Sequence, residues 1–479
     1  MMENTEQAAT VPGPELLSRY GTAGPRYTSY PTAPWWTDAF GPAQAAEALR
    51  GYRRAAGGLS LYVHIPFCER RCSFCACNVV ISRDHDKAGG YLDLLEREMD
   101  LALSHLAGGG AAGQVVQVHF GGGTPTWLSP AELHRLCRMI ASRFSLAADR
   151  EQSCEVHPVV TSAEQIDVLV ECGLNRLSMG VQDFNPAVQA AVNRHQTYEQ
   201  TARLIHHARQ RAVSSVNVDL IYGLPRQTLA GFARTIEQVI ELQIDRVALY
   251  NFAYLPERVQ AQQVIDPADL PPPELRTALF TTALEQFARA GYRQIGLDHF
   301  ARGGNELATA LDDGSLQRNF MGYTTRAGSD LLSFGVSSIS RVGPCFWQNS
   351  KELLEHREDI LAGRLPVERG LRLSDDDLLR EQIIQRLMCF ARVDLAALCT
   401  GPQGQALLES LCTGLLAEKL SAMQNDGLLR LEDGTLHVEP RGRYFLRNIA
   451  MLFDAYLGRT PPPQTIRGKT IQTRFSQTV

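Results

Sequence analysis

Four cysteines lie within ten residues in the stretch LYVHIPFCERRCSFCACN, which begins at Leu61: Cys68, Cys72, Cys75 and Cys77. Thiolates crowded into a short loop are typical of metal sites. Zinc sites usually draw their ligands from two separated pairs, and no convincing second pair follows this loop. Three thiolates on a [4Fe–4S] cluster would leave one iron open to bind and activate a ligand. The loop therefore favours an iron–sulfur cluster, with a zinc site and purely structural thiols as the alternatives.

Further chemistry-bearing residues fall at the ends of expected strands. The glycine-rich segment FGGGTP, at residues 120–125, follows one such strand. Glycines there allow a ligand to approach the backbone closely, although a tight turn would need them as well. Glu155, Gln182, Asp219 and Ala253 come at or just after the ends of later expected strands. These positions and Cys68 together predict a single site at one rim.

Strands and helices alternate from residue 59 to residue 291, as parallel βαβ units require. Either a doubly wound sheet or a complete or partial barrel fits this order, and both place function at the carboxyl ends of the strands. Ser129 is the expected N-cap of its helix, with Pro130 in the first turn. The expected strands are 59–67, 115–123, 153–158, 176–182, 215–225 and 246–256, and the expected helices are 91–106, 129–144, 162–173, 197–210, 229–242 and 273–291.

The composition is that of an ordinary globular protein with two or three domains: 479 residues, 44% hydrophobic and 21% charged. A net charge of -5 gives no sign of a nucleic-acid partner. No apolar run reaches the roughly 18 residues that span a membrane, and residues 1–17 do not read as a secretory signal. We therefore expect a cytoplasmic protein without nucleic-acid or membrane partners. The scattered cysteines are expected to be small buried side chains rather than disulfide partners: Cys137, Cys154, Cys172, Cys345, Cys389, Cys399 and Cys412.

Two further segments flank the strand–helix region. Residues 24–36, GPRYTSYPTAPWW, have no helical period and are expected to form an extended strap over hydrophobic surface. After about residue 365 the pattern is helical with a hairpin at 428–438, which resembles a winged helix. No basic recognition helix accompanies it, so a lid or scaffold is favoured over DNA binding. The expected domains are a leader and strap (1–58), a strand–helix domain (59–365) and a helical C-terminal domain (366–479).

The cysteine spacing C-x3-C-x-aromatic-C, with Phe74 as the aromatic residue, resembles the signature of the radical S-adenosylmethionine (radical SAM) superfamily. The resemblance implies that Cys68, Cys72 and Cys75 hold a [4Fe–4S] cluster whose open iron binds S-adenosylmethionine. An electron from the cluster would cleave this cofactor to a 5′-deoxyadenosyl radical that abstracts a hydrogen atom. FGGGTP matches the superfamily's glycine-rich contact to the methionine part. The implied fold is a partial (β/α)6 radical-SAM barrel.

Motifs from about Tyr20 to Val479 are similar to those of the oxygen-independent coproporphyrinogen III oxidases. They include GPRYTSYPTA, YVHIPFC, CSFCACN, NRLSMGVQDFN, VNVDLIYGLP, LDHFAR, RNFMGYTT and TRFSQTV. The resemblance implies oxidative decarboxylation of coproporphyrinogen III to protoporphyrinogen IX, in which two propionates become vinyl groups. It also implies two S-adenosylmethionine molecules per chain, an electron donor and an acceptor of unknown identity, and a monomer. The barrel would carry the N-terminal strap and a mainly helical C-terminal domain containing the small hairpin.

The resemblance assigns roles where the motifs match. Cys77 matches a fourth cysteine that does not hold the cluster. Asp219 and Arg194 could pair with the charged ends of a methionine, and Arg26 or Arg302 could contact a substrate propionate. No residue is assigned as a catalytic acid or base. The implied contacts are Tyr62, Gly122, Glu155 and Ile339 for the cluster-bound cofactor, and Phe74, Gly123, Thr124, Gln182, Arg194, Asp219 and Ala253 for the second.

The sequence departs from the family pattern at two places. His157 stands where an aspartate is expected, and the segment 387–394, LMCFARVD, differs from the usual family motif. Neither is a cluster ligand. Three alternative functions are a haem chaperone on the same fold, a radical methyltransferase or haem-degrading enzyme, and an iron–sulfur sensor with a DNA-binding winged helix. Cys77 and the strap argue against the chaperone, and the missing basic helix argues against the sensor.

Overall fold

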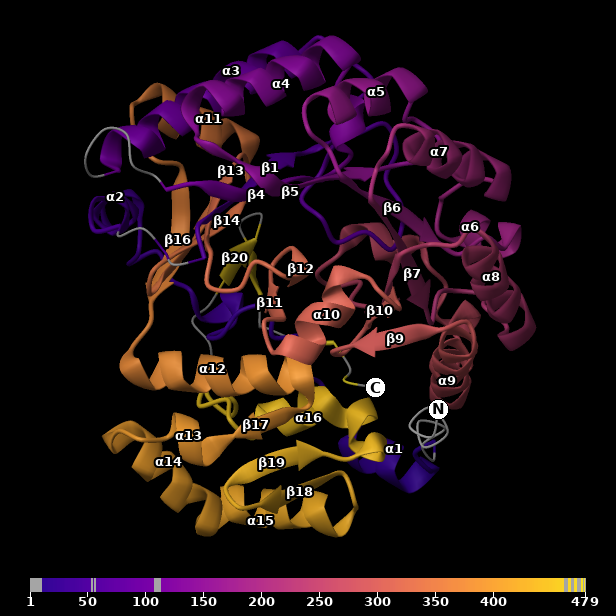
Figure 1. The fold of residues 1–479 in the computed structure, drawn as a ribbon, viewed down its shortest axis with the longest axis vertical. Coiled ribbons are helices and arrows are strands. Elements are labelled where there is room, and N and C mark those ends of the chain that lie inside the picture. Colours follow the sequence, from indigo (N-terminus) through magenta and orange to yellow (C-terminus); the bar gives the residue numbers. More distant parts are fainter. Residues whose placement is uncertain are drawn as a thin grey trace. The chain divides into compact units, whose positions relative to one another are not determined.

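The computed structural model describes residues 11–52, 55, 57–106, 113–460, 464–466, 469–471, 475, 476 and 478. The chain forms two units, which we describe separately (Figure 1). The barrel unit consists of Thr37–Pro272 and Arg326–Arg372, and the terminal unit consists of the residues up to Trp36, Pro273–Thr325 and the residues from Leu373 onward. The domain boundaries expected at residues 58 and 365 remain predictions.

A mostly parallel sheet is the centre of the barrel unit (Figure 1). From β1 to β8 each long strand pairs in parallel with the next, which confirms the predicted βα repeat. Beyond β1, β13 adds another parallel strand, and β14, β15 and β16 follow antiparallel. In sheet order the strands are β16 (Val367–Arg372), β15 (Cys345–Asn349), β14 (Ile339–Val342), β13 (Asp330–Phe334), β1 (Leu59–Ile65), β4 (Val115–Gly122), β5 (Leu146–Val156), β6 (Arg176–Gln182), β7 (Ser215–Tyr222) and β8 (Arg246–Asn251).

Helices connect these strands and lie along the outer side of the sheet (Figure 1). Ser129 caps its helix as predicted, since its hydroxyl accepts from the Glu132 amide while the Glu132 carboxylate accepts from the Ser129 amide. No helix among the described residues combines the length and apolar character that crossing a membrane requires. The helices of the barrel unit are α2 (Pro42–Arg50), α3 (Lys87–His105), α4 (Pro130–Arg143), α5 (Ala163–Glu171), α6 (Pro186–Ala191), α7 (Tyr198–Gln210), α8 (Leu229–Glu241) and α11 (Leu353–Leu361).

The sequence pattern does not predict the strands β13 to β16. Each spans six residues or fewer, and Gly335, with a φ of 98°, turns the chain directly after β13. Interruptions at such short intervals leave too little alternation for a strand to be recognised. Strand β5 also begins at Leu146, earlier than the expected start at residue 153.

The terminal unit combines helices with short strands. The predicted hairpin is confirmed as β18 and β19, with β17 as a third strand beside β19. The strap is anchored within this unit, because Tyr27 and Tyr30 are buried and both bond to the chain near residue 454. The elements are α1 (Pro14–Tyr20), α9 (Pro273–Arg289), β9 (Tyr292–Ile295), β10 (His299–Arg302), α10 (Glu306–Asp313), β11 (Gln317–Asn319), β12 (Gly322–Thr324), α12 (Asp375–Phe390), β17 (Arg392–Asp394), α13 (Leu395–Leu398), α14 (Pro402–Cys412), α15 (Gly414–Asn425), β18 (Leu429–Glu432), β19 (Thr435–Val438), α16 (Leu446–Met451), β20 (Gln464–Ile466) and β21 (Lys469–Ile471).

We expect Ser129→Ala to lower the free energy of unfolding of the barrel unit by about 1 kcal/mol, because the capping bond at the start of α4 is lost. Ser104→Ala is the matched control: its hydroxyl donates to Leu101 O within α3, is exposed, and caps no helix. The control should change the free energy by less than about 0.5 kcal/mol. Urea unfolding followed by circular dichroism measures both, and equal effects would contradict the capping role.

Candidate functional site

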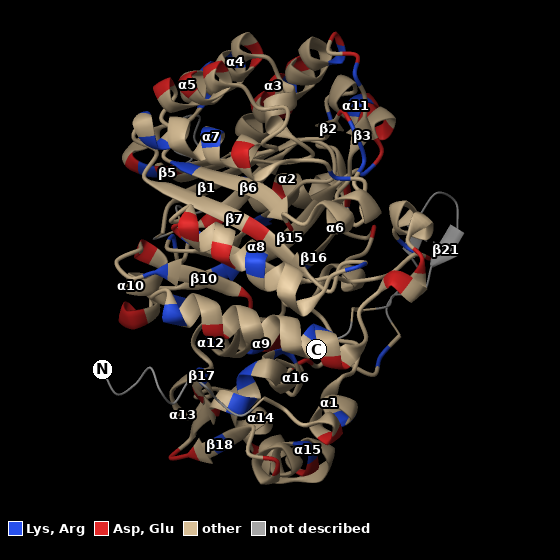
Figure 2. Cartoon of the chain, turned by 90° about the vertical axis from the view of Figure 1, so that its right-hand side faces the viewer, with Lys and Arg blue, Asp and Glu red and all other residues tan. Residues whose placement is uncertain are grey.

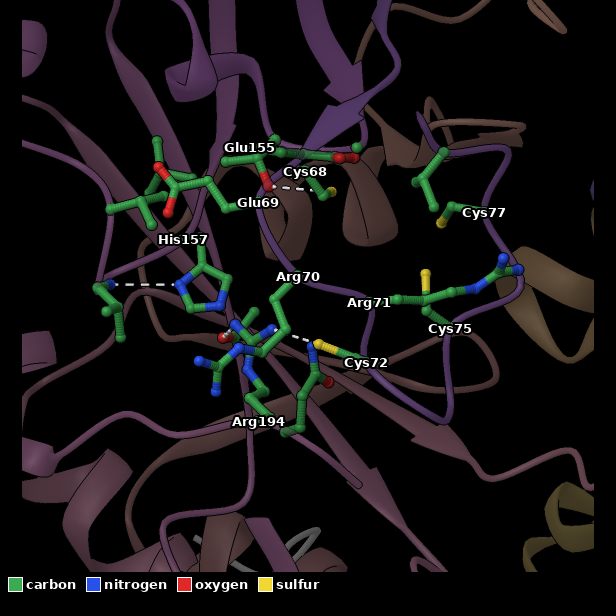
Figure 3. Close-up of a pocket in the computed structure, with 18 of the residues that line it drawn as sticks. Cys68, Glu69, Arg70, Arg71, Cys72, Cys75, Cys77, Glu155, His157 and Arg194 are labelled. Atoms are coloured by element: carbon green, nitrogen blue, oxygen red, sulfur yellow. Dashed lines mark hydrogen bonds between the residues drawn. The ribbon is translucent and has the colours of Figure 1, made fainter. Parts of the chain in front are cut away.

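A cavity of about 440 Å³ opens at the carboxyl ends of the parallel strands in the barrel unit (Figure 3). Its lining combines thiols and glycines with carboxylates and guanidinium groups. Tyr62, Ala253 and Ile339 lie outside this lining. The predicted site residues that line it are Cys68, Cys72, Phe74, Cys75, Gly122, Gly123, Thr124, Glu155, Gln182, Arg194 and Asp219.

The cysteine loop follows β2 (Phe67–Cys68) and curls around one side of the cavity. The Cys75 amide donates to Cys72 O at 3.2 Å, which closes a turn between these two cysteines. The Ser73 amide donates to Val192 O at 2.9 Å, so the loop is also tied to the segment after α6. Figure 3 shows Cys68, Cys72 and Cys75 on different sides of one space.

The thiols do not share one electrostatic environment. Burial raises the pKa of Cys68 to about 11. Burial also raises the pKa of Cys72, although the Arg194 guanidinium, 3.5 Å from its sulfur, opposes the shift. A hydrogen bond from the Cys77 thiol lowers the pKa of Cys75 to about 7 and raises that of Cys77 itself. Cys75 is thus the most readily ionised of the four thiols, and a metal bound through Cys68 and Cys72 would have to displace their protons.

These residues fit an iron–sulfur cluster. Each iron of a cubane takes its own thiolate, so the sulfurs need to surround the cluster rather than converge on one point. Within the described ranges, no three His, Cys, Asp or Glu side chains converge as a single metal ion would require. The Arg194 Nε is buried without a hydrogen-bond partner, and it borders the same cavity. A buried donor of this kind is suited to an anionic ligand such as a carboxylate.

In the segment FGGGTP, contacts within the protein already require glycine at positions 122 and 123. Gly122 has a φ of 111°, and a Cβ there would lie 2.6 Å from the His64 ring. A Cβ at Gly123 would lie 2.7 Å from the carbonyl oxygens of Pro66 and Phe67. Backbone bonds then hold the segment against the chain that leads into the cysteine loop, from the Gly123 amide to Ile65 O and from the Thr124 amide to Phe67 O.

Glu155 presents its carboxylate to the cavity from the end of β5. Burial would raise the pKa of this carboxyl, but hydrogen bonds from His119 Nε2 at 3.2 Å and the Gly122 amide at 3.1 Å bring it below its ordinary value. His119 is itself held by Ser153 through its other ring nitrogen at 2.6 Å. The site therefore contains a fixed negative charge suited to an ammonium group or a ribose hydroxyl.

Gln182 and Asp219 occupy neighbouring strands. Gln182 ends β6 at a register shift and has a φ of 69°, unusual for a residue other than glycine. Burial and the nearby Glu155 charge raise the pKa of Asp219 to about 7. Asn217 fixes this carboxyl by donating to its Oδ1 at 2.8 Å. Asp219 can thus change its protonation state near neutral pH when a charged ligand enters.

Three predicted residues do not line the cavity: Tyr62, Ala253 and Ile339. The Tyr62 hydroxyl donates to His64 Nδ1 at 3.0 Å, and its ring stacks on His119, 5.7 Å between centroids. Ala253 O accepts from Gln262 Nε2 at 2.9 Å, and Ile339 begins β14.

Sequence reasoning missed several lining residues. Ser178 and Gly180 alternate with Gln182 along β6, a period-two signal that was present in the sequence. Arg70 and Arg71 lie between two of the cysteines. His157, noted only as a departure, also lines the cavity, and burial followed by repulsion from Arg194 lowers its pKa to about 3.

Comparisons with known proteins agree with this site. Residues 62–239 match the Radical SAM superfamily, and residues 373–445 match the HemN C-terminal domain. The chain is 43% identical to the oxygen-independent coproporphyrinogen III oxidase of Pseudomonas aeruginosa, covering 92% of this chain and 95% of that one. The solved coproporphyrinogen III oxidase (HemN) of Escherichia coli is 40% identical, with a TM-score of 0.85 over 93% of this chain and 100% of that chain. The chain belongs to the oxygen-independent coproporphyrinogen III oxidase family.

Family membership decides between the readings that the cysteine loop left open. The radical SAM family implies a [4Fe–4S] cluster and S-adenosylmethionine, which favours the iron–sulfur interpretation of the loop over a zinc site. The match over 92% of the chain to an oxygen-independent coproporphyrinogen III oxidase also favours this family over the chaperone, methyltransferase and sensor alternatives. The roles of individual site residues remain predictions.

We expect the free energy of unfolding to fall between pH about 4 and about 7 in part because of Asp219. The unfolded chain loses this proton near the ordinary pKa of 3.8, whereas the folded chain retains it up to about 7. The contribution of Asp219 to the free energy of unfolding therefore decreases as pH rises through that interval, and it changes no further above pH about 7.

Asp219→Asn, which cannot ionise, should flatten this part of the profile. Asp38→Asn removes an exposed carboxylate of the same unit and should leave the wild-type profile unchanged. Urea titrations under argon measure both variants, and an unaltered profile for Asp219→Asn would show that Asp219 ionises normally.

Proposed function

We propose that this protein catalyses the oxygen-independent oxidative decarboxylation of coproporphyrinogen III to protoporphyrinogen IX, a step of porphyrin and haem biosynthesis. Each of two propionates would lose a hydrogen atom from its β-carbon, an electron and carbon dioxide, and become a vinyl group. The observation that carries this proposal is one cavity at the strand ends, lined by the family's cluster and cofactor motifs, in a chain 43% identical to such an oxidase.

The cluster would be held by Cys68, Cys72 and Cys75, with Cys77 left unligated. When bound, the cluster and S-adenosylmethionine supply one-electron cleavage and a hydrogen-abstracting radical. We further propose two S-adenosylmethionine molecules per chain. Cavity residues support contacts to both: Gly122 and Glu155 for the first, and the set around Gln182, Arg194 and Asp219 for the second.

The protein's own groups would position and shield these molecules. Glu155 is ionised and pre-oriented by His119, so it can anchor a positive or hydroxyl-bearing part of a cofactor without reorganising. The free Nε of Arg194 can donate to a carboxylate. Apolar side chains in the cavity wall would keep water from reactive species: Val79, Val156, Val159 and Val160.

The proposed reaction also requires partners that exchange electrons with the protein. Electrons must enter and leave, so a donor and an acceptor are required, and the sequence identifies neither. In the view of Figure 2, Lys and Arg are interspersed with Asp and Glu along the helices of both units. The net charge of -5 likewise gives no sign of a nucleic-acid partner. A monomer in the cytoplasm, and propionate contacts from Arg26 or Arg302, remain predictions.

The cysteine assignment can be tested by metal content. We expect Cys72→Ala to abolish cluster assembly after anaerobic reconstitution, whereas Cys77→Ser should retain iron and sulfide because three thiolates suffice. Cys412→Ser, an exposed thiol outside the loop, is the control and should behave like the wild type. Iron and sulfide analysis with visible absorbance measures all three. Loss of iron in Cys77→Ser as complete as in Cys72→Ala would overturn the ligand set.

The reaction itself can be tested anaerobically with the reconstituted protein, S-adenosylmethionine, a reductant and coproporphyrinogen III. We expect loss of two carbon dioxide units from the porphyrinogen, with 5′-deoxyadenosine released. Cys72→Ala provides the inactive control. Release of 5′-deoxyadenosine with intact coproporphyrinogen would instead point to a methyltransferase or haem-acting enzyme.

A further inference from the structure

Gln182 and Arg194 line the same cavity although a turn and the helix α6 separate them along the chain. Gln182 also has a φ of 69°, a backbone conformation that L residues rarely adopt without support from their surroundings. The strand pairing changes register here, so the regular ladder does not impose this geometry. Other groups must hold the end of β6.

Two buried glutamines form hydrogen bonds to the backbone on both sides of Gln182. Gln196 Nε2 donates to Val181 O at 3.0 Å, and Gln189 Nε2 donates to Asp183 O at 2.8 Å. The side chains of Gln189 and Gln196 are 4% and 5% exposed, so water cannot replace either bond easily. The two residues adjoining Gln182 are thus fixed by side chains from the segment that follows.

The same glutamines fix the backbone around Arg194. Gln189 O accepts from the Arg194 amide at 2.9 Å, and Gln189 Oε1 accepts from the Gln196 amide at 3.0 Å. Arg194 in turn donates from Nη2 to Gly180 O. Gln189 therefore bonds to Arg194 and to Gln196, while it also bonds to Asp183, the residue after β6.

A buried carboxylate anchors this arrangement. Asp183 is 1% exposed and accepts from the Asn185 amide at 2.8 Å, from Thr235 Oγ1 at 2.6 Å and from Gln227 Nε2 at 2.8 Å. Thr235 belongs to α8 and Gln227 precedes it, so the residue after β6 is bonded to helix α8 and to the segment before it. A buried, fully bonded carboxylate tolerates little displacement.

We propose that Gln189 and Gln196, anchored by Asp183, are positioning residues that hold Gln182 and Arg194 in one geometry for binding S-adenosylmethionine. None of the three lines the cavity, so they act through the two residues that do. This inference rests on the proposed function, because it takes S-adenosylmethionine as the ligand at Gln182 and Arg194.

The first test measures S-adenosylmethionine binding to the cluster-loaded protein by anaerobic equilibrium dialysis. Gln196→Met keeps the length of the side chain but leaves Val181 O without its donor, and the binding of S-adenosylmethionine on the Gln182 side should weaken roughly tenfold. Iron content should match the wild type. The matched control is Asn175→Leu at the opposite end of β6, where Asn175 donates to Arg150 O and accepts from the Gln152 amide. It should lower thermal stability without changing affinity.

A double-mutant cycle separates positioning from general destabilisation. If Gln196 acts through Gln182, then Gln196→Met should weaken binding much less in a Gln182→Ala background than in the wild type. Should Gln196→Met fail to fold, Gln189→Glu serves instead: it retains the acceptor for the Gln196 amide and loses the donor to Asp183 O. It should show the same affinity loss and the same non-additivity.

Affinity within twofold of the wild type in the folded variant, or full additivity with Gln182→Ala, would overturn the inference. So would binding weakened equally by Asn175→Leu. These outcomes are distinct from failure of the proposed function, in which the wild type binds S-adenosylmethionine but leaves coproporphyrinogen III intact.

Discussion

The site depends on the register of the parallel strands from β1 to β7. In this register Glu155 lies opposite Ser178, and Gly180 lies opposite Asp219, so residues distant in sequence meet at one edge. A slip of one residue would turn these side chains to the other face of the sheet. Buried apolar residues such as Leu61 and Phe120, both 0% exposed, make such a slip costly because they would leave the core. The hydrophobic pattern of the strands thus fixes the position of the polar groups.

Burial of those polar groups requires specific partners. Glu155 remains ionised because His119 and the Gly122 amide donate to it, and Asp219, with fewer donors, has a raised pKa. The two carboxylates therefore differ in charge near neutral pH although they share a cavity. Glu155 can therefore bind a cationic group without changing its protonation state. Asp219 can lose its proton when a second cationic group binds beside it.

The sequence predicted the parts of the fold that repeat. Strand–helix alternation located the barrel strands, and the cysteine spacing with the strand-end residues located part of the cavity lining. The strands β13 to β16 were missed because they are short and interrupted, and their periodicity is correspondingly weak. The supports of Gln182 could not be predicted either. Gln189 is a single polar residue in the short helix PAVQAA and Gln196 lies in the polar stretch NRHQTYEQ, and neither pattern shows that the fold buries the side chain. For the glycine-rich segment, the sequence could not show which contacts require the glycines. Their positions were predicted, but Gly122 is required by the His64 ring as much as by any ligand.

The cysteine loop and the end of β6 are also connected to each other. Arg194 donates to Gly180 O and lies 3.5 Å from the Cys72 sulfur, while Asn193 Nδ2 donates to Arg71 O at 2.8 Å. Movement of the segment after α6 would therefore shift both the contact to the Cys72 thiol and the backbone at the end of β6. Because these bonds join the same short segment to both parts, a shift of that segment would change the two together. The geometry required for a cluster and the geometry required for a cofactor beside it are thus satisfied by one set of contacts.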